Sequence, residues 1–344
     1  MTSRAPSMPR RALLDILEAS RLSACIYVAA KLEITDLLKD GPMSRDALAQ
    51  MTGTHESSLY RLLRVLAGAG ILHEAEDGHF TLAPAGTYLQ RDTPDSLRPW
   101  VLMFHDVNSR PYGELLHTVK TGESAFTHVM GSDLFPYFAE HPDVGTLFDE
   151  AMTVETAHIA QAVLDAYDFS GFRRIVDVGG SHGTLLAAIL HAHPAIHGVL
   201  FDRTRVVERA KRVLDAAGLG NRCEYVGGSF LKSVPAGCDA YVLKNIIHDW
   251  SDERAVEILG NCRRAMHEQG KILIVERLVQ AEDATSLETL CADLDMLVLG
   301  GGHGARERTE AEYRALCRAA GCELTRVIRT RSDYDYYVME VVPG

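Results

Sequence analysis

The stretch "RRIVDVGGSHG", residues 173–183, decides how the second half of the chain is interpreted. Its apolar residues are typical of a buried strand, and this strand runs directly into a turn of closely spaced glycines. From here on, strand patterns alternate with helix patterns. The alternation predicts an α/β fold, a doubly wound and mostly parallel seven-stranded sheet with helices on both faces. Strands are expected at 173–178, 198–202, 223–230, 240–245, 271–277, 324–330 and 336–343, and helices at 184–193, 205–218, 253–270 and 310–321.

Acidic residues and glycines gather at the ends of the first two strands. Asp177 closes the first strand, and Gly179, Gly180 and Gly183 form the turn into the next helix. Asp202 closes the second strand, 23 residues after Gly179. In doubly wound sheets ligands bind at the carboxyl ends of the strands, and an acid at about this spacing accepts hydrogen bonds from ribose hydroxyls. The two strand ends therefore predict a nucleoside site.

The order of residues in this turn separates three classes of nucleoside ligand. A phosphate-binding loop of the GxxxxGK[ST] type would need a lysine after Gly183, and there is none. The dinucleotide pattern GxGxxG is replaced by GGxxG, and the turn opens with the carboxylate of Asp177. That carboxylate would repel a pyrophosphate but attract the ammonium group of a methionine moiety. The sign of the charge favours S-adenosylmethionine, although a turn that is merely tight remains an alternative.

The third and fourth strands also end in side chains that can do chemistry. Ser229 and Phe230 follow the third strand and could meet the edge and face of an adenine. The fourth strand runs into "VLKNIIHDWSDE", residues 242–253, which places Lys244 and His248 at the binding edge before a helix capped by Ser251. A histidine held by a carboxylate can act as a general base near neutral pH.

The carboxylate that holds His248 is expected from a distant part of the chain. Glu276 at the end of the fifth strand and Glu307 in "ARERT" are the two candidates. Asp249 is adjacent in sequence, but neighbouring residues at a helix start point in different directions. We therefore expect the two glutamates, and not Asp249, to orient the imidazole.

Composition and charge limit the classes of partner that the chain can bind. Its 344 residues suffice for two domains, and a net charge of −12 argues against nucleic acid or an anionic membrane as the main partner. No apolar run approaches the roughly 20 residues of a membrane span, and the first residues lack the apolar core of a signal peptide. Seven cysteines without a CxxC pair are expected as reduced thiols of a cytoplasmic protein. The histidines at 191, 193 and 197 have no suitably spaced partner, so no metal site is expected.

The first 100 residues carry a different pattern. Two helices are expected before Gly41-Pro42, followed by a helix from Ser44, a turn at Thr52-Gly53, a longer helix and a hairpin at Asp77-Gly78. This is the order of a winged helix, and a DNA-binding regulator is therefore one alternative. Because the longer helix offers few cations, dimerisation or a substrate lid is favoured for 1–100. Residues 101–344 are expected to form the catalytic domain, in which 101–168 is a helical bridge.

Taken together, these motifs resemble a known family. "VDVGGSHG", "FD", "GGSF", "LKNIIHDW", "VERL" and "RERTEAEYRAL" occur in the order, and nearly at the spacing, of the S-adenosylmethionine-dependent small-molecule O-methyltransferases. These include the plant caffeic acid and flavonoid enzymes and bacterial enzymes that methylate polyketides and antibiotics. The resemblance implies a Rossmann-like class I methyltransferase domain behind a winged-helix dimerisation domain, with the N-terminal helices interlocked in a homodimer.

The resemblance also implies a role for each matching residue. His248 falls on the catalytic base, and Glu276 and Glu307 on the two glutamates that flank it. The family's cofactor contacts fall on the strand-end residues Asp177, Gly179, Gly180, Asp202, Ser229, Phe230 and Lys244. Three departures stand out: Ser229 where plant members have aspartate, Ser181 in place of a turn glycine, and a longer glycine-rich segment at 300–304. Ser181 fits the turn if its backbone angles are ordinary.

The expected reaction is transfer of a methyl group from S-adenosylmethionine to a phenolic hydroxyl of a small aromatic molecule, leaving S-adenosylhomocysteine. No metal, nucleic acid or membrane enters this hypothesis. Met152, Asp295, Met296 and the loop near His303 are the candidates for the acceptor pocket. A relative that keeps the cofactor but catalyses decarboxylation, hydroxylation or cyclisation is the alternative within the same fold.

Overall fold

The alternation that begins at Arg173 forms one seven-stranded sheet in the computed structural model, which describes residues 9–344 apart from 94, 281–284, 301–303 and 333. The strand order is β6-β5-β4-β7-β8-β10-β9. The first five are parallel, whereas β10 runs antiparallel to both β8 and β9. This confirms the predicted fold class. The strands are β4 (Arg174–Val178), β5 (His197–Asp202), β6 (Cys223–Gly227), β7 (Ala240–Lys244), β8 (Lys271–Arg277), β9 (Cys322–Arg329) and β10 (Tyr336–Pro343).

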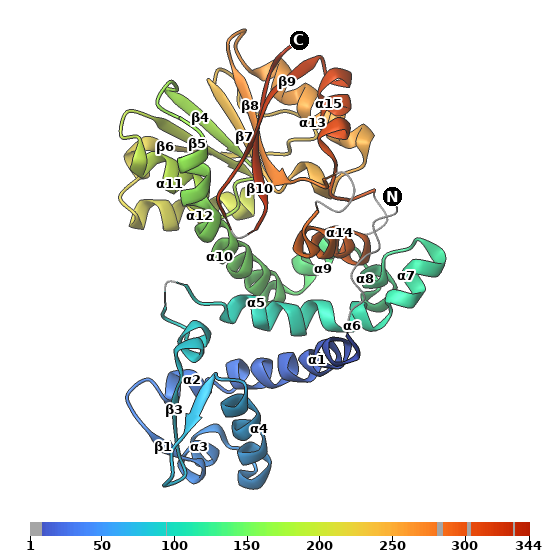
Figure 1. The fold of residues 1–344 in the computed structure, drawn as a ribbon. Coiled ribbons are helices and arrows are strands. Elements are labelled where there is room, and N and C mark those ends of the chain that lie inside the picture. The colour runs from blue at the N-terminus through green and yellow to red at the C-terminus, as the bar shows by residue number, and fades with distance from the viewer. Residues whose placement is uncertain (1–8, 94, 281–284, 301–303, 333) are drawn as a thin grey trace. The chain divides into compact units, whose positions relative to one another are not determined.

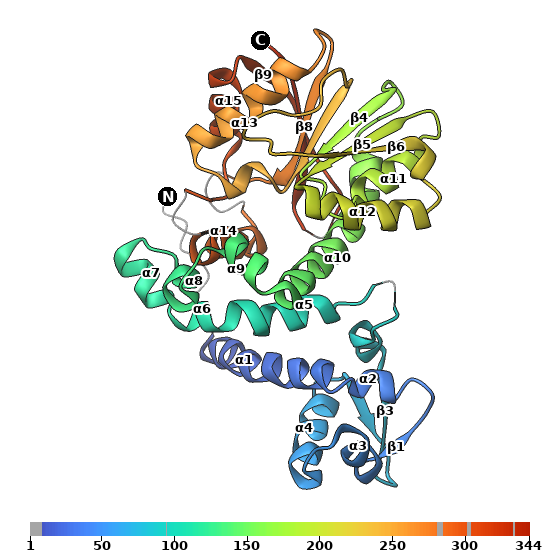
Figure 2. The same ribbon diagram turned by 180° about the vertical axis from the view of Figure 1, so that it is seen from behind.

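Helices cover both faces of this sheet, as Figures 1 and 2 show. One face packs against α10 (Pro142–Ala166), α11 (Thr184–Ala192) and α12 (Thr204–Ala216), and the other against α13 (Asp252–Ala265) and α15 (Glu310–Ala319). Successive strand residues point to opposite faces, so Val176 enters one core and Ile175 the other. Both faces of the parallel strands are therefore buried, which accounts for their continuous apolar runs.

The strand order reverses beside β4, whose two neighbours are β5 and β7. At such a switch point the loops after the strands diverge and leave room for a ligand beyond the carboxyl ends. The glycine turn follows β4, and the segment around His248 follows β7. The topology therefore brings the two strongest sequence motifs to the same edge of the sheet.

The stretch between the N-terminal elements and β4 is helical, as expected for the bridge at 101–168. It contains α5 (Arg98–Met103), α6 (Ser109–Gly113), α7 (Leu115–Thr121), α8 (Ala125–Met130), α9 (Leu134–Glu140) and α10, with a π-helical turn at Phe104–Asn108. Later in the chain α14 (Leu287–Leu299) packs against α7 and α8. The two compact units of the chain are Met1–Ser109 and Arg110–Gly344.

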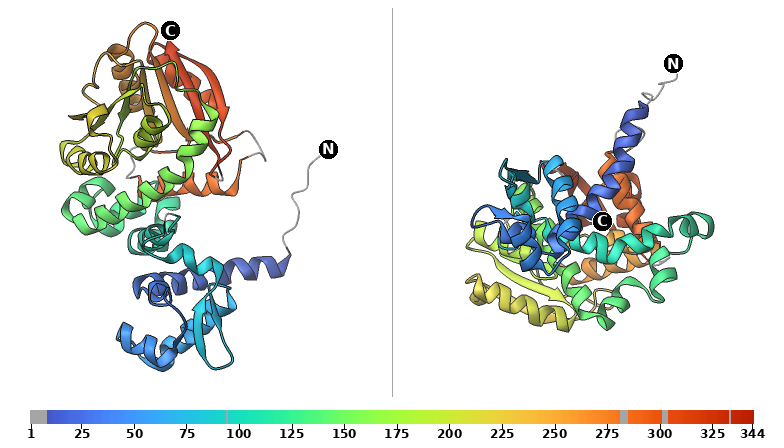
Figure 3. Two further views of the ribbon diagram at one scale, coloured as in Figure 1. Left: turned by 90° about the vertical axis from the view of Figure 1, so that its left-hand side faces the viewer. Right: turned by 90° about the horizontal axis from the view of Figure 1, so that it is seen from below.

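The first unit contains the elements of a winged helix. They are α1 (Arg10–Lys31), α2 (Ile34–Leu37), β1 (Met43–Ser44), α3 (Arg45–Thr52), α4 (Glu56–Gly68), β2 (Leu72–Glu74), β3 (His79–Leu82) and a 3₁₀ helix at Pro84–Leu89. Ser44 caps α3 by accepting a hydrogen bond from the Ala47 amide, and the β2–β3 hairpin turns at Gly78. In Figure 3 the N-terminal part of α1, in dark blue, extends beyond the other elements of its unit.

Among the residues that the structure describes, no helix is both long enough and apolar enough to span a membrane.

Candidate active site

The glycine turn after β4 leaves no space for side chains. Gly179 has a φ of +72°, and a Cβ on it would overlap the Ile246 side chain and lie 3.6 Å from Cε1 of Phe230. A Cβ on Gly180 would lie 2.7 Å from the Asp177 carboxyl carbon. Glycine is thus required here for both conformation and space. The same contacts show that the ends of β4, β6 and β7 meet at Gly179, as the sequence predicted for a shared binding edge.

Asp202 stands at the end of β5 with its carboxylate already oriented. The amides of Ser181 and Arg203 donate to its two oxygens at 3.0 and 2.6 Å. Ser181 adopts a φ of +49°, so the condition under which a serine would fit this turn easily is not met. This left-handed conformation is unfavourable for serine, and it points the Ser181 amide at Asp202. The carboxylate therefore connects the glycine turn to the second strand.

Asp177 lies under the turn, where it is 4% exposed. Burial, and secondarily the charge of Asp202, raises the pKa of this carboxyl to about 7. The carboxyl group packs against Gly180, where a Cβ would lie 2.7 Å from it. Its predicted contact with a methionine ammonium group stays a prediction.

Phe230 and Ser229 are half-buried in the loop after β6. The Phe230 ring packs edge-to-face on Trp250, with 5.7 Å between ring centroids, and its carbonyl accepts a hydrogen bond from Asn261 at 2.7 Å. The Ser229 carbonyl caps the following turn through the Lys232 amide. The aromatic face beside Gly179 is therefore held in place by the segment that carries His248.

Lys244 belongs to a buried ionic network that the sequence did not reveal. Its ammonium group lies 3.0 Å from Glu155 on α10 and 3.0 Å from the Thr156 hydroxyl. Glu155 also accepts hydrogen bonds from Arg277 at 3.0 Å and from Tyr336 at 3.1 Å. Burial opposes the charged carboxylate, but the two cations outweigh it and lower the pKa of Glu155 to about 2. The signal for this network was Glu155, the one charged residue in the run 151–164 of this helix.

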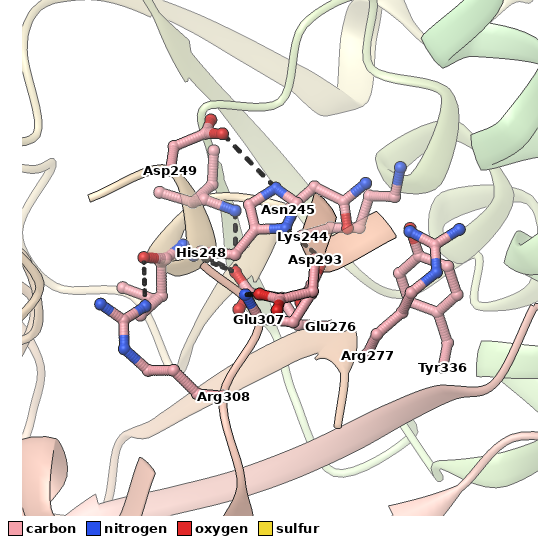
Figure 4. Close-up of polar contacts among 12 residues, drawn as sticks. Lys244, Asn245, His248, Asp249, Glu276, Arg277, Asp293, Glu307, Arg308 and Tyr336 are labelled. Atoms are coloured by element: carbon pink, nitrogen blue, oxygen red, sulfur yellow. Dashed lines mark hydrogen bonds and ion pairs between the residues drawn. The ribbon is translucent and has the colours of Figure 1, made fainter. Parts of the chain in front are cut away.

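His248 lies in the short segment between β7 and α13. Asn245 turns the chain with a φ of +54°, and a single 3₁₀ turn, Ile247–Asp249, then presents the histidine. The imidazole is 6% exposed, and its Nδ1 lies 2.9 Å from the Glu307 carboxylate (Figure 4). The predicted pairing of His248 with Glu307 is present in the structure. With Nδ1 engaged, Nε2 is the nitrogen left for a substrate proton.

Glu276 is beside the histidine but holds its backbone. One carboxylate oxygen accepts hydrogen bonds from the amides of Ile246 and Ile247 at 2.9 and 2.6 Å, and the other accepts one from the Tyr313 hydroxyl. The sequence placed this glutamate correctly at the histidine, but it did not show that the contact is to the chain rather than to the ring.

Asp249 lies closer to the imidazole than expected. Its carboxylate is 3.6 Å from Nε2 of His248, so the inference that the two neighbours point apart was wrong (Figure 4). Both side chains belong to the single 3₁₀ turn Ile247–Asp249, and both are directed to the same side of it. Burial opposes the charged imidazole, but Glu307 and Asp249 outweigh it and raise the pKa of His248 to about 10.

Two further residues complete this region and were not predicted. Arg308 is fully buried and donates to the carbonyls of Ile247 and Trp250, and Asp293 on α14 accepts a hydrogen bond from the Glu307 amide at 2.9 Å. The sequence signal for Arg308 was its position in the "RERT" motif, next to Glu307. A fully buried arginine needs specific partners, and the turn supplies them. Asp293 had no local signal.

The acceptor candidates are only partly assembled. Met152, Asp295 and Met296 are half-buried, and the Tyr112 hydroxyl donates to Asp295 at 2.6 Å. No contact between these three residues and His248 is found among the described residues. His303 lies outside the described residues, as do residues 301 and 302 of the glycine-rich segment. Nor does the described part of the chain contain a group of three or more His, Cys, Asp or Glu side chains that could hold a metal ion.

The sheet order, the glycine turn and the acid after β5 together define the class I methyltransferase fold, and comparisons with known proteins agree. The crystal structure of the mitomycin 7-O-methyltransferase MmcR superposes with a TM-score of 0.90 at 34% identity, covering 97% of each chain. The protein-family model of the O-methyltransferase domain matches residues 112–323, and the family model of the O-methyltransferase dimerisation domain matches residues 14–92. The chain therefore belongs to the O-methyltransferase family.

Individual relatives cover nearly the whole chain. A phenazine O-methyltransferase of Lysobacter antibioticus is 43% identical over 320 residues, 93% of each chain. An 8-amino-8-demethylriboflavin N,N-dimethyltransferase of Streptomyces davaonensis is 36% identical over 312 residues, 89% of this chain and 88% of that one. Relatives at this level of identity thus methylate either oxygen or nitrogen.

Proposed function

We propose that this chain transfers the methyl group of S-adenosylmethionine to a phenolic hydroxyl of a small aromatic molecule in antibiotic-type secondary metabolism, with His248 as the general base. The observation that carries the proposal is the buried imidazole, whose Nδ1 is held by Glu307 at 2.9 Å. A carboxylate on one ring nitrogen fixes the tautomer in which the other can accept a proton. The relatives named above support an aromatic acceptor.

The residues at the switch point fit the cofactor. The glycine turn has no side chains to keep a ligand from its backbone, Asp202 presents an oriented carboxylate for ribose hydroxyls, and Phe230 offers an aromatic surface beside Gly179. When bound, the cofactor supplies the sulfonium methyl group. Lys244 would contribute positive charge to this edge through its network with Glu155, and Asp177 would hold the glycine turn from below.

His248 acts on the acceptor hydroxyl. A phenol has a pKa of about 10, so little of it is ionised at neutral pH. Burial opposes the charged imidazole, but Glu307 and Asp249 raise the pKa of His248, so the neutral form that accepts the proton of a bound phenol at Nε2 becomes more populated as pH rises. The imidazolium that results is stabilised by the same two carboxylates. The site thus generates a nucleophilic phenolate and keeps its proton next to it.

The test is the substitution His248→Ala. Because the imidazole contacts Glu307 and not the glycine turn, cofactor affinity measured by calorimetry should stay within about threefold, while turnover falls by about 10² to 10⁴-fold, the usual contribution of a general base. Turnover is measured with labelled S-adenosylmethionine and a panel of phenols and aromatic amines. A variant at nearly the wild-type rate would refute the assignment. EDTA-treated protein should keep its activity, because the proposed step uses no metal.

Nitrogen methylation is the second candidate, favoured by the riboflavin-type relative. A neutral aromatic amine is already a nucleophile and does not have to lose its proton before it attacks. Methylation of an amine in the panel should therefore be far less sensitive to His248→Ala than methylation of a phenol. If His248→Ala slowed the methylation of amines and phenols equally, His248 would not act as a base for hydroxyls alone.

We also propose that the first unit forms a homodimer. Leu13, Ile16 and Leu17 lie at helical spacing on α1 and are 54, 55 and 59% exposed. An exposed apolar stripe of this kind is typical of a protein–protein interface, and the dimerisation-domain match, residues 14–92, covers Ile16 and Leu17. Sedimentation should give a dimer for the native chain and a monomer after all three residues are changed to serine.

A further inference from the structure

The turn that carries His248 exposes unpaired backbone groups at both of its ends. Like the ends of a helix, a single 3₁₀ turn leaves free N–H groups where it begins and free carbonyls where it finishes. At Ile246 and Ile247 the free N–H groups are bound by the buried carboxylate of Glu276. At the other end the Trp250 carbonyl needs a buried donor, and the Ile247 carbonyl, which already accepts the Trp250 amide within the turn, has a second lone pair to satisfy.

Arg308 supplies those donors. Its guanidinium donates to the Ile247 carbonyl at 3.0 Å and to the Trp250 carbonyl at 2.6 Å. Two further bonds, at 3.0 and 2.9 Å, join it to the Asp252 carboxylate in the first turn of α13. The side chain is fully buried, so these partners replace water completely. The turn is thus held between an anion on its N–H side and a cation on its carbonyl side.

Arg308 directly follows Glu307, the residue that holds the imidazole ring. A single dipeptide therefore fixes the ring of His248 through one side chain and the backbone on both sides of His248 through the other. Any movement of Arg308 changes the position of the turn relative to Glu307. This arrangement couples the orientation of the ring to the orientation of its backbone.

We propose that Arg308 is a positioning residue for the methyl transfer, which sets the location of His248 Nε2 by holding the carbonyls of Ile247 and Trp250. The inference rests on the proposed base role of His248 and extends it to a residue that does not touch the substrate. Only a guanidinium has a planar fork of donors that reaches two carbonyls and a carboxylate at once. Lysine would keep the charge and lose the fork.

The matched experiment compares Arg308→Lys with Arg306→Lys. Arg306 also pairs with Asp252, but its guanidinium otherwise contacts Glu312 and no carbonyl of the turn, and its side chain is 38% exposed. We expect Arg308→Lys to lower kcat by about 10- to 100-fold, the effect of a misplacement on the order of 1 Å, with cofactor affinity within about threefold of wild type. Arg306→Lys should change kcat by less than about twofold, as surface substitutions usually do.

A double-mutant cycle with His248→Ala separates positioning from general loss of structure. If Arg308 acts through the histidine, Arg308→Lys should have almost no further effect on the residual rate of His248→Ala. An equal loss in both backgrounds, a loss of cofactor affinity parallel to kcat, or a wild-type kcat would each overturn the inference. A fully active His248→Ala would instead refute the proposed function, and the positioning role with it.

Asp252→Ala provides a second test if Arg308→Lys does not fold. The Asp252 side chain is 53% exposed, so its loss should be tolerated, yet it removes two of the bonds that orient the buried guanidinium. We expect a smaller decrease in kcat, about 3- to 10-fold, that again disappears in the His248→Ala background. A decrease that persists in that background would contradict the proposal.

Discussion

The substitution Asp249→Asn tests the electrostatics of the histidine most directly. It removes one negative charge 3.6 Å from Nε2 and keeps the shape of the side chain. At that distance two unit charges interact by about 1 kcal/mol in bulk water and by about 5 kcal/mol at an effective dielectric constant near 20. One pKa unit corresponds to about 1.4 kcal/mol. Since the Asp249 side chain is 28% exposed, we expect the pKa of His248 to fall by about 1 to 2 units.

The assay is the pH dependence of kcat/KM, together with a nuclear magnetic resonance titration of His248. The base form of a histidine with a pKa of about 10 becomes more populated as pH rises, so wild-type kcat/KM should increase about tenfold per unit between pH 7 and 9. In Asp249→Asn the same rise should occur at a pH lower by about 1 to 2 units. Glu253→Gln removes an exposed charge from the next helix and should leave the profile in place.

An unchanged pH profile would show that Asp249 has no effect on the histidine. If the acid limb of Asp249→Asn coincides with that of wild type, and the titration of His248 is also unchanged, then Asp249 does not influence the imidazole in solution. A shift to higher pH would contradict the sign of the interaction, because removing a carboxylate must make the imidazolium easier to deprotonate.

The other predictions concern the glycine turn, the acidic strand ends and stability. Gly179→Ala should weaken cofactor binding by at least about tenfold because its Cβ meets Ile246. The control Gly171→Ala, whose Cβ meets nothing within 4 Å, should leave the affinity unchanged. Equal calorimetric affinities for the two variants would count against cofactor binding at the glycine turn. Asp202→Asn should weaken cofactor binding more than Asp177→Asn, since Asp177 is 4% exposed and lies under the turn. The reverse order would indicate that Asp177 contacts the cofactor directly. The raised pKa of His248 stabilises the fold fully below the unfolded value of about 6.5, and this contribution is lost as pH rises towards about 10. The stability difference between wild type and His248→Ala in urea should therefore shrink over that range, and a difference that grows would contradict the shift.

The fold was predictable because its signals are local and periodic. The inner parallel strands are largely apolar runs, and residues such as Asp202 and His248 lie at or after the ends of strands whose carboxyl ends share one edge. Topology alone then brings motifs from distant parts of the chain together. For the partner of His248 the residues left two candidates, Glu276 and Glu307, and the resemblance to the family placed both beside the histidine; Glu307, 59 residues away, is the one that pairs with the ring.

The geometry inside the site was less predictable, because it depends on exact backbone angles. Asp249 lies 3.6 Å from Nε2 of His248, although the two are neighbours in sequence, and a positive φ at Ser181 aims an amide at Asp202. The network around Glu155 joins α10, β7, β8 and β10, and no sequence spacing predicts a contact among four such elements. These features follow from packing, which the linear pattern does not contain.

The residues that support the histidine turn are synthesised after the histidine itself. Glu276, Glu307 and Arg308 all follow His248 in the chain, the last two by 59 and 60 residues. A ribosome therefore releases the histidine well before the side chains that hold it exist. The working form of the turn arises only after α14 and the "RERT" segment have been synthesised and docked, so the catalytic centre is among the last parts of the molecule to be completed.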